Sequence, residues 1–242
     1  MPTQEILILA MTKMLSGICT AGFSCDPTSA TGLCWVRPTR PFDSVLLGDM
    51  TTTEGHLVQC CDVVELDLLE PRCDPPHVED WVTDFIHRRP RLRRRLEGDK
   101  RAAFFAENLD QAPEEVLCLN TRSLCLVQPR DVWARFSLDP YSGKYQARMG
   151  FTLDCKSQNP RAQSPQGCSV TDLKWRALGR EWLSEGANAL ELSLTDIRER
   201  LDAEALYLTL GLSRKYRGVY WPLVHAVHVV PDYNASIDLS YL

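Results

Sequence analysis

The sequence lacks the patterns that would place it at once in a familiar functional class. No apolar run approaches the ~18 residues that a membrane-spanning helix requires, so no such helix is expected. Glu5 precedes a short apolar run at 6–10 that continues into the domain, which is not the pattern of a secretory signal. A Cys-x-x-Cys pair, a Gly-x-Ser-x-Gly elbow and the glycine-rich prelude of a phosphate-binding loop are all missing. The sequence therefore does not favour a zinc ribbon, a serine hydrolase or a P-loop enzyme.

An excess of positive charge is also missing. The chain has 242 residues, with 27 Lys and Arg against 32 Asp and Glu, for a formal net charge of −5. A nucleic-acid site must therefore be a local basic patch, because the whole protein does not attract a polyanion. Ten cysteines without a secretory signal indicate a reducing compartment, so we expect free thiols and a cytoplasmic location.

Three short strands are predicted at the start of the chain. The apolar runs at 6–10 and 18–23 are short and bounded, as buried strands are. A turn-rich segment at 26–32 reverses the chain, and a third strand at 33–37 ends at Pro38, which cannot donate to a ladder. Three strands joined by loops form a β-meander, the start of a small barrel.

This opening resembles that of the prokaryotic dual OB-containing domain family. The resemblance is carried by Thr12-Lys13, by Gly-Ile-Cys-Thr-Ala-Gly at 17–22 and by Gly-Leu-Cys-Trp-Val-Arg-Pro at 32–38. Weaker matches follow along most of the chain, at 76–81, 124–129, 169–172 and 206–230. The resemblance implies two OB-like barrels and no established reaction, and it makes nucleic-acid binding an expectation from fold analogy.

The chain is accordingly predicted to contain two β-rich halves. Residues 1–130 form a first OB-like barrel with a helical insertion at about 78–109, and a strand at 123–127 closes it. Residues 131–242 form a second OB-like barrel with a C-terminal arm after Pro231. The predicted fold class is mainly β, with two OB-like barrels in one chain.

A polar segment after the first strand is one candidate site. Thr12 and Lys13, followed by Ser16 and Gly17, could present an ammonium group and backbone N–H groups to a phosphate. The alternative is that this segment is a solvated connection between strands.

Trp35 and Arg37 form a second candidate. They lie two residues apart on a predicted strand, so they share a face of it. An indole can stack on a base, and a guanidinium group can pair with a backbone phosphate. Alternatively, Trp35 fills the barrel and Arg37 pairs with an acidic neighbour such as Glu65.

Cations gather in further places along the chain. The largest basic cluster spans 88–101, and it could bind nucleic acid or form a solvated helix face paired with acidic residues. The segment 214–221 mixes cations with aromatic residues, which suits stacking on a single strand or an ordinary exposed hairpin. The residues predicted to contact nucleic acid or a nucleotide are Thr12, Lys13, Trp35, Arg37, Arg40, Arg93, Arg94, Arg95, Lys215 and Tyr216.

No catalytic residue, metal site or cofactor is assigned from the sequence. His77 could act as a base and Asp172 on a ligand, but a loop histidine and a helix cap are the simpler roles. Cys73 and His77 are spaced like half of a zinc site, without a second paired motif to complete it.

The function predicted from these observations is a non-enzymatic binding module for single-stranded nucleic acid or a nucleotide-derived ligand. Two other classes stay open. One is an enzyme that processes nucleotides or nucleic acid through Lys13, His77 or Asp172. The other is a protein-interaction adaptor in a larger complex, with which the acidic net charge is compatible.

Overall fold

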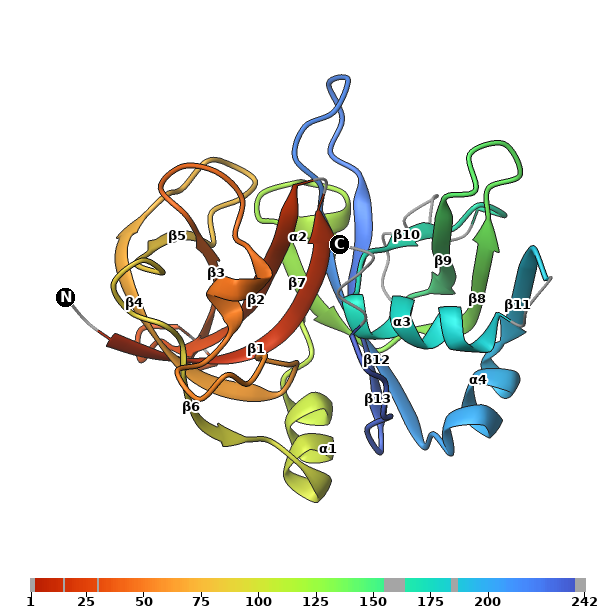
Figure 1. The fold of residues 1–242 in the computed structure, drawn as a ribbon, viewed down its shortest axis with the longest axis horizontal. Coiled ribbons are helices and arrows are strands. Elements are labelled where there is room, and N and C mark those ends of the chain that lie inside the picture. Colours follow the sequence, from red (N-terminus) through yellow and green to blue (C-terminus); the bar gives the residue numbers. More distant parts are fainter. Residues whose placement is uncertain (1–2, 15, 30, 155–163, 184–186, 238–242) are drawn as a thin grey trace.

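Strands dominate the structure and form two sheets, with short helices at their margins. The computed structural model describes residues 3–14, 16–29, 31–154, 164–183 and 187–237 (Figure 1). One sheet is built from strands between residues 3 and 95, and the other from strands between residues 124 and 230. The prediction of a mainly β fold is confirmed.

The first sheet curls into a closed five-stranded barrel with one extra strand. Its members are β1 (Thr3–Met14), β2 (Gly17–Cys25), β3 (Leu33–Thr39), β4 (Asp62–Pro71), β5 (Asp80–Thr83) and β6 (Arg91–Arg95). The strand order is β1-β2-β3-β5-β4, and a further pairing of β4 with β1 closes the ring. β3 and β5 run parallel, and β6 extends the sheet beyond β4. We call this unit the first barrel.

The second sheet has seven strands. They are β7 (Leu124–Val127), β8 (Arg130–Leu138), β9 (Tyr145–Thr152), β10 (Cys168–Val170), β11 (Ala189–Ser193), β12 (Ala205–Leu212) and β13 (Pro222–Val230). Their order is β11-β8-β9-β10-β13-β12-β7. The inner part, β8-β9-β10-β13-β12, repeats the strand order of the first barrel, and its β10–β13 pair is again parallel. The two halves therefore share one plan, and we call the second unit the second barrel.

Helical segments occupy the connections. They are a 3-10 turn η1 (Leu47–Met50) and the helices α1 (Gly98–Glu107), α2 (Glu114–Leu117), α3 (Leu173–Trp182) and α4 (Leu194–Leu201). The prediction that Asp172 caps a helix ending at Trp182 is confirmed, since its carboxylate accepts from the backbone N–H groups of Lys174 and Trp175. Among the described residues, no helix is long and apolar enough to cross a membrane.

Strand β1 lies between the two barrels and is buried on both faces. Its Ile6 and Ile8 belong to the core of the first barrel. Leu9 belongs to a separate apolar cluster, together with Leu126 and Tyr207 of the second barrel. Because a strand alternates its side chains between two faces, β1 contributes to a core on one side and to the junction on the other.

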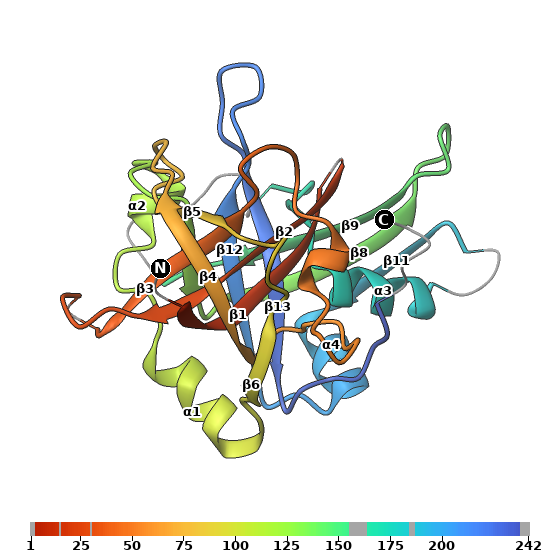
Figure 2. The same ribbon diagram turned by 60° about the vertical axis from the view of Figure 1, so that its left-hand side comes forward.

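Hydrogen bonds cross the same junction. The hydroxyl of Thr209 on β12 donates to the carbonyl of Leu9 at 3.0 Å. The backbone N–H of Lys13 donates to the carbonyl of Thr171 at 2.8 Å, just before α3 begins. Both bonds hold β1 against the second barrel, and Figure 2 shows β1 beside β13 and β12 from a second direction.

The predicted helical insertion at 78–109 is wrong for most of its length. Residues 80–83 form β5 and residues 91–95 form β6, so only Gly98–Glu107 is helical. The arginine-rich run had the composition of a solvated helix. It forms a strand because its partner β4 supplies hydrogen-bonding groups and carboxylates, a tertiary influence that composition does not reveal.

Two other expectations about the edges of the fold are also wrong. The strand at 124–127 does not close the first barrel, because β7 pairs with β12 of the second. A short apolar run identifies a buried strand but not its partner. The chain after Pro231 is not wholly peripheral, since Tyr233 is 6% exposed and packs against Trp175, while residues 238–242 lie outside the described part.

Candidate nucleic-acid interface

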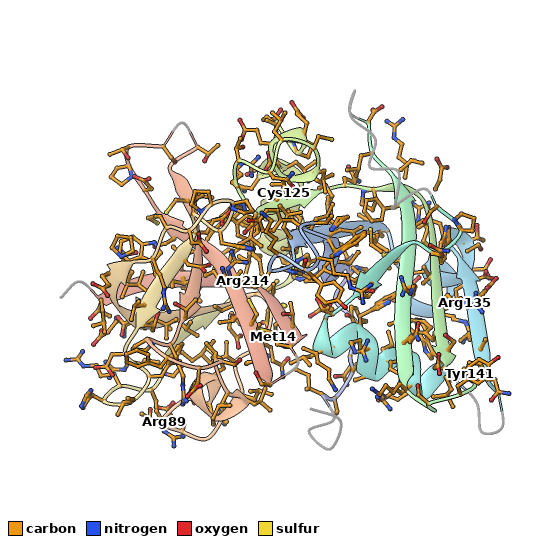
Figure 3. All side chains as sticks on the ribbon, turned by 90° about the horizontal axis from the view of Figure 1, so that it is seen from above. Met14, Arg89, Cys125, Arg135, Tyr141 and Arg214 are labelled. Atoms are coloured by element: carbon orange, nitrogen blue, oxygen red, sulfur yellow. The ribbon has the colours of Figure 1, made fainter. Side chains whose placement is uncertain are left out.

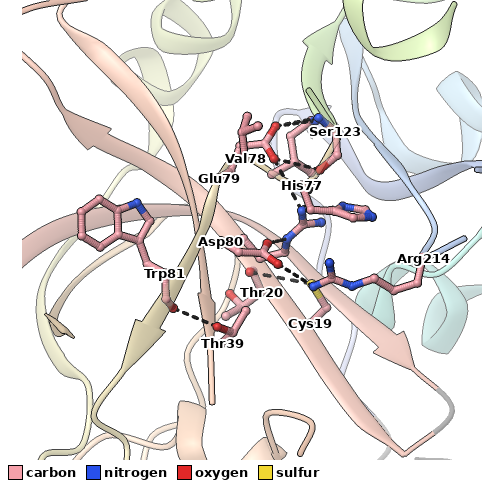
Figure 4. A network of polar contacts seen from close by, with 12 residues as sticks. Cys19, Thr20, Thr39, His77, Val78, Glu79, Asp80, Trp81, Ser123 and Arg214 are labelled. Carbon is pink, nitrogen blue, oxygen red and sulfur yellow. Dashed lines mark hydrogen bonds and ion pairs between the residues drawn. The ribbon is translucent and has the colours of Figure 1, made fainter. Parts of the chain in front are cut away.

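Arg37 belongs to a buried polar network where the two barrels meet. Figure 4 labels its partners His77, Glu79, Asp80 and Ser123. Arg37 is 4% exposed, and its Nε donates to Asp80 Oδ1 at 2.5 Å. Its Nη2 donates to His77 Nδ1 at 2.8 Å and to Ser123 Oγ at 2.7 Å. Glu79 Oε2 lies 3.5 Å from the same Nη2. The prediction that Arg37 shares an exposed face with Trp35 is therefore wrong. Two adjacent buried carboxylates neutralise its charge, as the acidic-partner alternative required, although Glu65 is not among them.

His77 is a neutral member of this network. A guanidinium group only donates, so His77 Nδ1 accepts and its proton resides on Nε2. Burial, and then the positive charges of Arg37 and Arg214, lower the pKa of His77 to about 4. The imidazole is 2% exposed, and its Nδ1 is occupied by Arg37.

Arg214 connects this network to the surface. Its Nη2 lies 2.5 Å from Asp80 Oδ2, yet its side chain is 53% exposed. It stands at the base of the loop between β12 and β13, which we call the tip hairpin (residues 213–221). The hydroxyl of Tyr220 in this hairpin donates to the carbonyl of Pro75 at 3.4 Å. The first barrel thus anchors a loop that belongs to the second.

The tip hairpin presents cations on aromatic rings. Lys215 Nζ lies 5.7 Å from the ring centre of Tyr220, and Arg217 Cζ lies 5.3 Å from that of Tyr216. Tyr216 is 59% exposed. The hairpin projects beyond both sheets in Figures 1 and 2. Within the described residues, neither Lys215 nor Arg217 forms an ion pair with a carboxylate. Two of the predicted contact residues, Lys215 and Tyr216, lie here.

Comparison with known protein families gives a match that covers both barrels. The family model of the dual OB-containing domain matches residues 4–227. The chain belongs to the dual OB-containing domain family. No curated protein and no solved structure gives a match. Membership agrees with the repeated strand order, so the two barrels of this dual OB-containing chain are OB-like, as predicted.

Thr12 and Lys13 do not form a polar turn in this dual OB-containing chain. Both lie within β1, and Thr12 is 2% exposed and bridged to Asp172. The interpretation of Thr12 as a phosphate contact is therefore wrong. Lys13 is half-buried, and burial lowers its pKa, as do the charges of Arg176 and Arg180 on α3.

Trp35 packs among apolar side chains, as the alternative of a packing role predicted. It is half-buried, and its ring centre lies 4.2 Å from that of Phe23 in an apolar cluster that includes Phe104. Its remaining exposed edge leaves it a minor candidate for stacking. Arg40 also has a structural partner, because its Nη2 donates to Asp49 Oδ1 at 2.6 Å.

The arginines of β6 face acidic residues of the neighbouring strands. Each of the three predicted residues has a carboxylate partner. Arg93 pairs with Glu65 at 3.1 Å, Arg94 with Glu5 at 2.9 Å and Arg95 with Asp62 at 2.6 Å. Their side chains are still 42–63% exposed, so the pairs are solvent-screened and can exchange partners. This basic strand therefore carries much less net charge than its sequence suggests.

The candidate catalytic and metal residues have other contacts in this fold. Asp172 is 2% exposed and accepts from the N–H groups of Lys174, Trp175 and Val227, so it is a cap. Burial raises its pKa to about 6. Cys73 Sγ donates to the carbonyl of Val78. No group of three or more metal-ligating side chains occurs in the described ranges.

Sequence reasoning missed one basic cluster. Arg176 and Arg180 on α3 both lie over the ring of Tyr145, with Cζ 5.0 and 4.2 Å from its centre. Their spacing of four residues on a helix already predicted from its cap could have identified them, since such residues share a helix face. Their proximity to Lys13 could not have been found, because it depends on how β1 meets α3.

Proposed function

We propose that this dual OB-containing protein is a non-enzymatic module that binds single-stranded nucleic acid or a nucleotide-derived ligand through its tip hairpin. The observation that supports the proposal is the exposed ring of Tyr216 beside Arg217, next to Lys215 on Tyr220. Neither Lys215 nor Arg217 has a carboxylate partner among the described residues, whereas Arg214 of the same loop pairs with Asp80. Arg93, Arg94 and Arg95 pair with carboxylates, whereas Lys215 and Arg217 are available to an anionic ligand.

The physical basis is stacking combined with local charge. Every base has a π face, so an exposed tyrosine stacks on a base without regard to sequence. Arg217 and Lys215 lie close enough to reach the flanking phosphates, and Arg214 adds a third cation at the base of the hairpin. The net charge of −5 means that the protein as a whole adds no general attraction for a polyanion.

The arginines of β6 have a lesser role in the proposal. Arg93, Arg94 and Arg95 must each give up a carboxylate partner before they contact a phosphate. The loss of these ion pairs offsets part of the free energy gained by binding the phosphate. We also propose the reducing cytoplasm as the location, which is supported by the nine described cysteines all being free thiols.

The test is the affinity for a labelled single strand of about 20 nucleotides, a length above the site size of one OB fold. Replacing Tyr216 with Ala and Arg217 with Gln together should weaken binding about tenfold or more and flatten its salt dependence. Replacing Arg93, Arg94 and Arg95 with Gln should have a smaller effect.

The matched control is Tyr141→Ala. Tyr141 is 98% exposed on the β8–β9 hairpin, and Figure 3 shows it at the far side of the second barrel from Arg214. This variant should bind as the wild type does. Equal affinity of the Tyr216/Arg217 variant and the wild type would reject the tip hairpin. Failure of the wild type to bind any strand at low salt would favour the protein-interaction adaptor.

A further inference from the structure

Strands β8, β9 and β10 of the second barrel turn one sheet face to the exterior. A strand alternates its side chains between two faces, and Ala134, Phe136 and Met149 belong to the core. The residues between them therefore point outward, and Figure 3 shows Arg135 on the side of the second barrel away from the first barrel. We call this surface the outer face and define it by Trp133, Arg135, Arg148 and Ser169, which strand alternation and cross-strand pairing bring together.

The corresponding face of the first barrel is covered. The two barrels share one strand order, so β8, β9 and β10 correspond to β1, β2 and β3. On the first barrel this face carries Phe23 and Trp35, which belong to one apolar cluster with Tyr207 of the second barrel. It forms the junction, whereas on the outer face the side chain of Arg135 is 47% exposed. The face that is used between the barrels in one copy is thus open in the other.

Trp133 supplies an aromatic surface on the outer face. A Cβ added at Gly150 would lie 2.0 Å from the indole Nε1, and one added at Gly167 would lie 2.8 Å from Cη2. Glycine at both positions therefore lets the ring lie on the backbone of the sheet. The indole is half-buried there, so part of it stays exposed to solvent. An aromatic ring held against rigid backbone with an exposed part is suited to stacking on a base.

Arg135 and Arg148 form a like-charge pair beside this ring. They lie directly opposite each other on adjacent strands, an arrangement that is destabilising for like charges. Glu191 on β11 lies 3.4 Å from Arg135 and offsets its charge in part. The guanidinium group of Arg148 has no ion-pair or hydrogen-bond partner within the described ranges, and its neighbour on β10 is the neutral Ser169. Stability does not account for this pair, whereas an anion between the two arginines would relieve their repulsion.

We propose that the outer face binds single-stranded nucleic acid, with a base stacked on Trp133 and the adjoining backbone phosphate held between Arg135 and Arg148. Guanidinium groups donate paired N–H bonds to phosphate oxygens, and the hydroxyl of Ser169 can donate one more. The inference rests on the proposed function, since it assigns a second contact surface to the same strand. Ser169 pairs with Leu223, two residues after the tip hairpin ends, so one strand can contact both surfaces.

The experiment uses the same labelled strand of about 20 nucleotides as the test of the tip hairpin. Arg148→Gln should weaken binding about tenfold, as the loss of a hydrogen bond to a charged group does. It should also reduce the slope of log affinity against log salt by about 0.7, the value for one phosphate contact on a single strand. Its free energy of unfolding should stay equal to that of the wild type or rise, because a like-charge pair is removed. A purely structural role for Arg148 predicts no change in the salt slope.

Tryptophan fluorescence is the second readout. Trp133→Phe keeps an aromatic ring over Gly150, and the strand should quench its fluorescence less than that of the wild type, because the stacked indole is gone. The variant with Tyr216→Ala and Arg217→Gln keeps Trp133, so a saturating strand should still quench this indole. This readout separates the outer face from the tip hairpin.

The matched control is Arg198→Gln, which removes one exposed arginine from α4 of the same barrel and should keep the wild-type affinity. Wild-type affinity and salt slope in Arg148→Gln would overturn the outer face, even where the tip-hairpin variant binds more weakly. Wild-type affinity of the tip-hairpin variant together with weaker binding by Arg148→Gln would reject the tip hairpin and support the outer face. Absence of strand binding by the wild type at low salt would reject both.

Discussion

Asp80 and Arg214 form an ion pair across the junction of the two barrels, with Arg214 Nη2 2.5 Å from Asp80 Oδ2. The other carboxylate oxygen of Asp80 receives Arg37 Nε, also at 2.5 Å. Asp80 is 1% exposed, so one buried carboxylate compensates two guanidinium groups, one from each barrel. The barrels therefore share a charge network as well as an apolar layer.

Replacing Asp80 with Asn is expected to destabilise the protein by about 3 kcal/mol or more, because it leaves the buried charge of Arg37 without its nearest partner. The measurement is the free energy of unfolding in urea. The control is Arg214→Gln, which should cost less than about 1 kcal/mol, since Arg214 is half-exposed and Arg37 keeps its pair. Similar costs for both variants would contradict this division of roles.

The hydroxyl of Thr209 is expected to contribute to the junction. It donates to the carbonyl of Leu9 at 3.0 Å and lies 2.9 Å from His228 Nε2, in a fully buried position. Thr209→Val keeps the shape and should cost about 1–3 kcal/mol, because it leaves buried polar groups unpaired. Thr152→Val loses only a solvent-accessible bond to Asp131, and its denaturation midpoint should stay near that of the wild type. A Thr209→Val midpoint equal to that of Thr152→Val would rule out this contribution.

Stability should fall as the pH is lowered below 6.5. Burial is the main cause that lowers the pKa of His77 to about 4 and those of His225 and His228 to about 3, from an ordinary value of 6.5. Below pH 6.5 the unfolded chain binds protons that the folded chain does not, and each histidine then costs roughly 1.4 kcal/mol per pH unit. Asp172 opposes this trend, because its raised pKa of about 6 stabilises the folded state most at low pH, and that stability is lost as the pH rises through 6.

The pH prediction is tested with His225→Asn, because Nδ1 of His225 has no hydrogen-bond partner among the described residues. Unfolding free energies measured between pH 7 and about pH 5 should show a slope that is smaller by about one proton than in the wild type. The slope of unfolding free energy against pH is compared, and not the free energy itself, because the loss of a buried ring lowers stability at every pH. An unchanged slope would show that His225 does not titrate on unfolding in this range.

The sequence predicts those features that depend on neighbouring residues. The opening strands, the hairpin of β8 and β9 and the cap at Asp172 all follow from local periodicity and capping chemistry. The environment of Arg37 could not be predicted, because its partner Asp80 is 43 residues away and Arg214 is 134 residues from Asp80. Composition indicates that an arginine is present, and only the fold determines whether it faces solvent or a buried carboxylate.

The last prediction concerns the close packing of α3 against the sheet of the second barrel. A Cβ added at Gly179 would lie 2.1 Å from Phe136 Cδ1 and 2.5 Å from the Tyr145 hydroxyl oxygen, so the helix approaches the sheet closely at this residue. Alanine favours a helix over glycine by about 1 kcal/mol, but overpacking against a buried ring costs about 1–3 kcal/mol or more. Gly179→Ala should therefore destabilise the protein and displace Arg176 and Arg180 from Tyr145.

Two measurements check this prediction. The free energy of unfolding in urea should fall in Gly179→Ala, because the added methyl group overlaps Phe136. The environment of the Tyr145 ring, followed by near-ultraviolet circular dichroism, should change with it, because Arg176 and Arg180 lie over that ring. Gly48→Ala is the matched control, since nothing lies within 4 Å of a Cβ at Gly48. It should be neutral or slightly stabilising, because alanine restricts the unfolded chain more than glycine does. A Gly179→Ala protein as stable as Gly48→Ala would mean that α3 can move away from the sheet at little cost, and the arginines would then not be held rigidly over Tyr145.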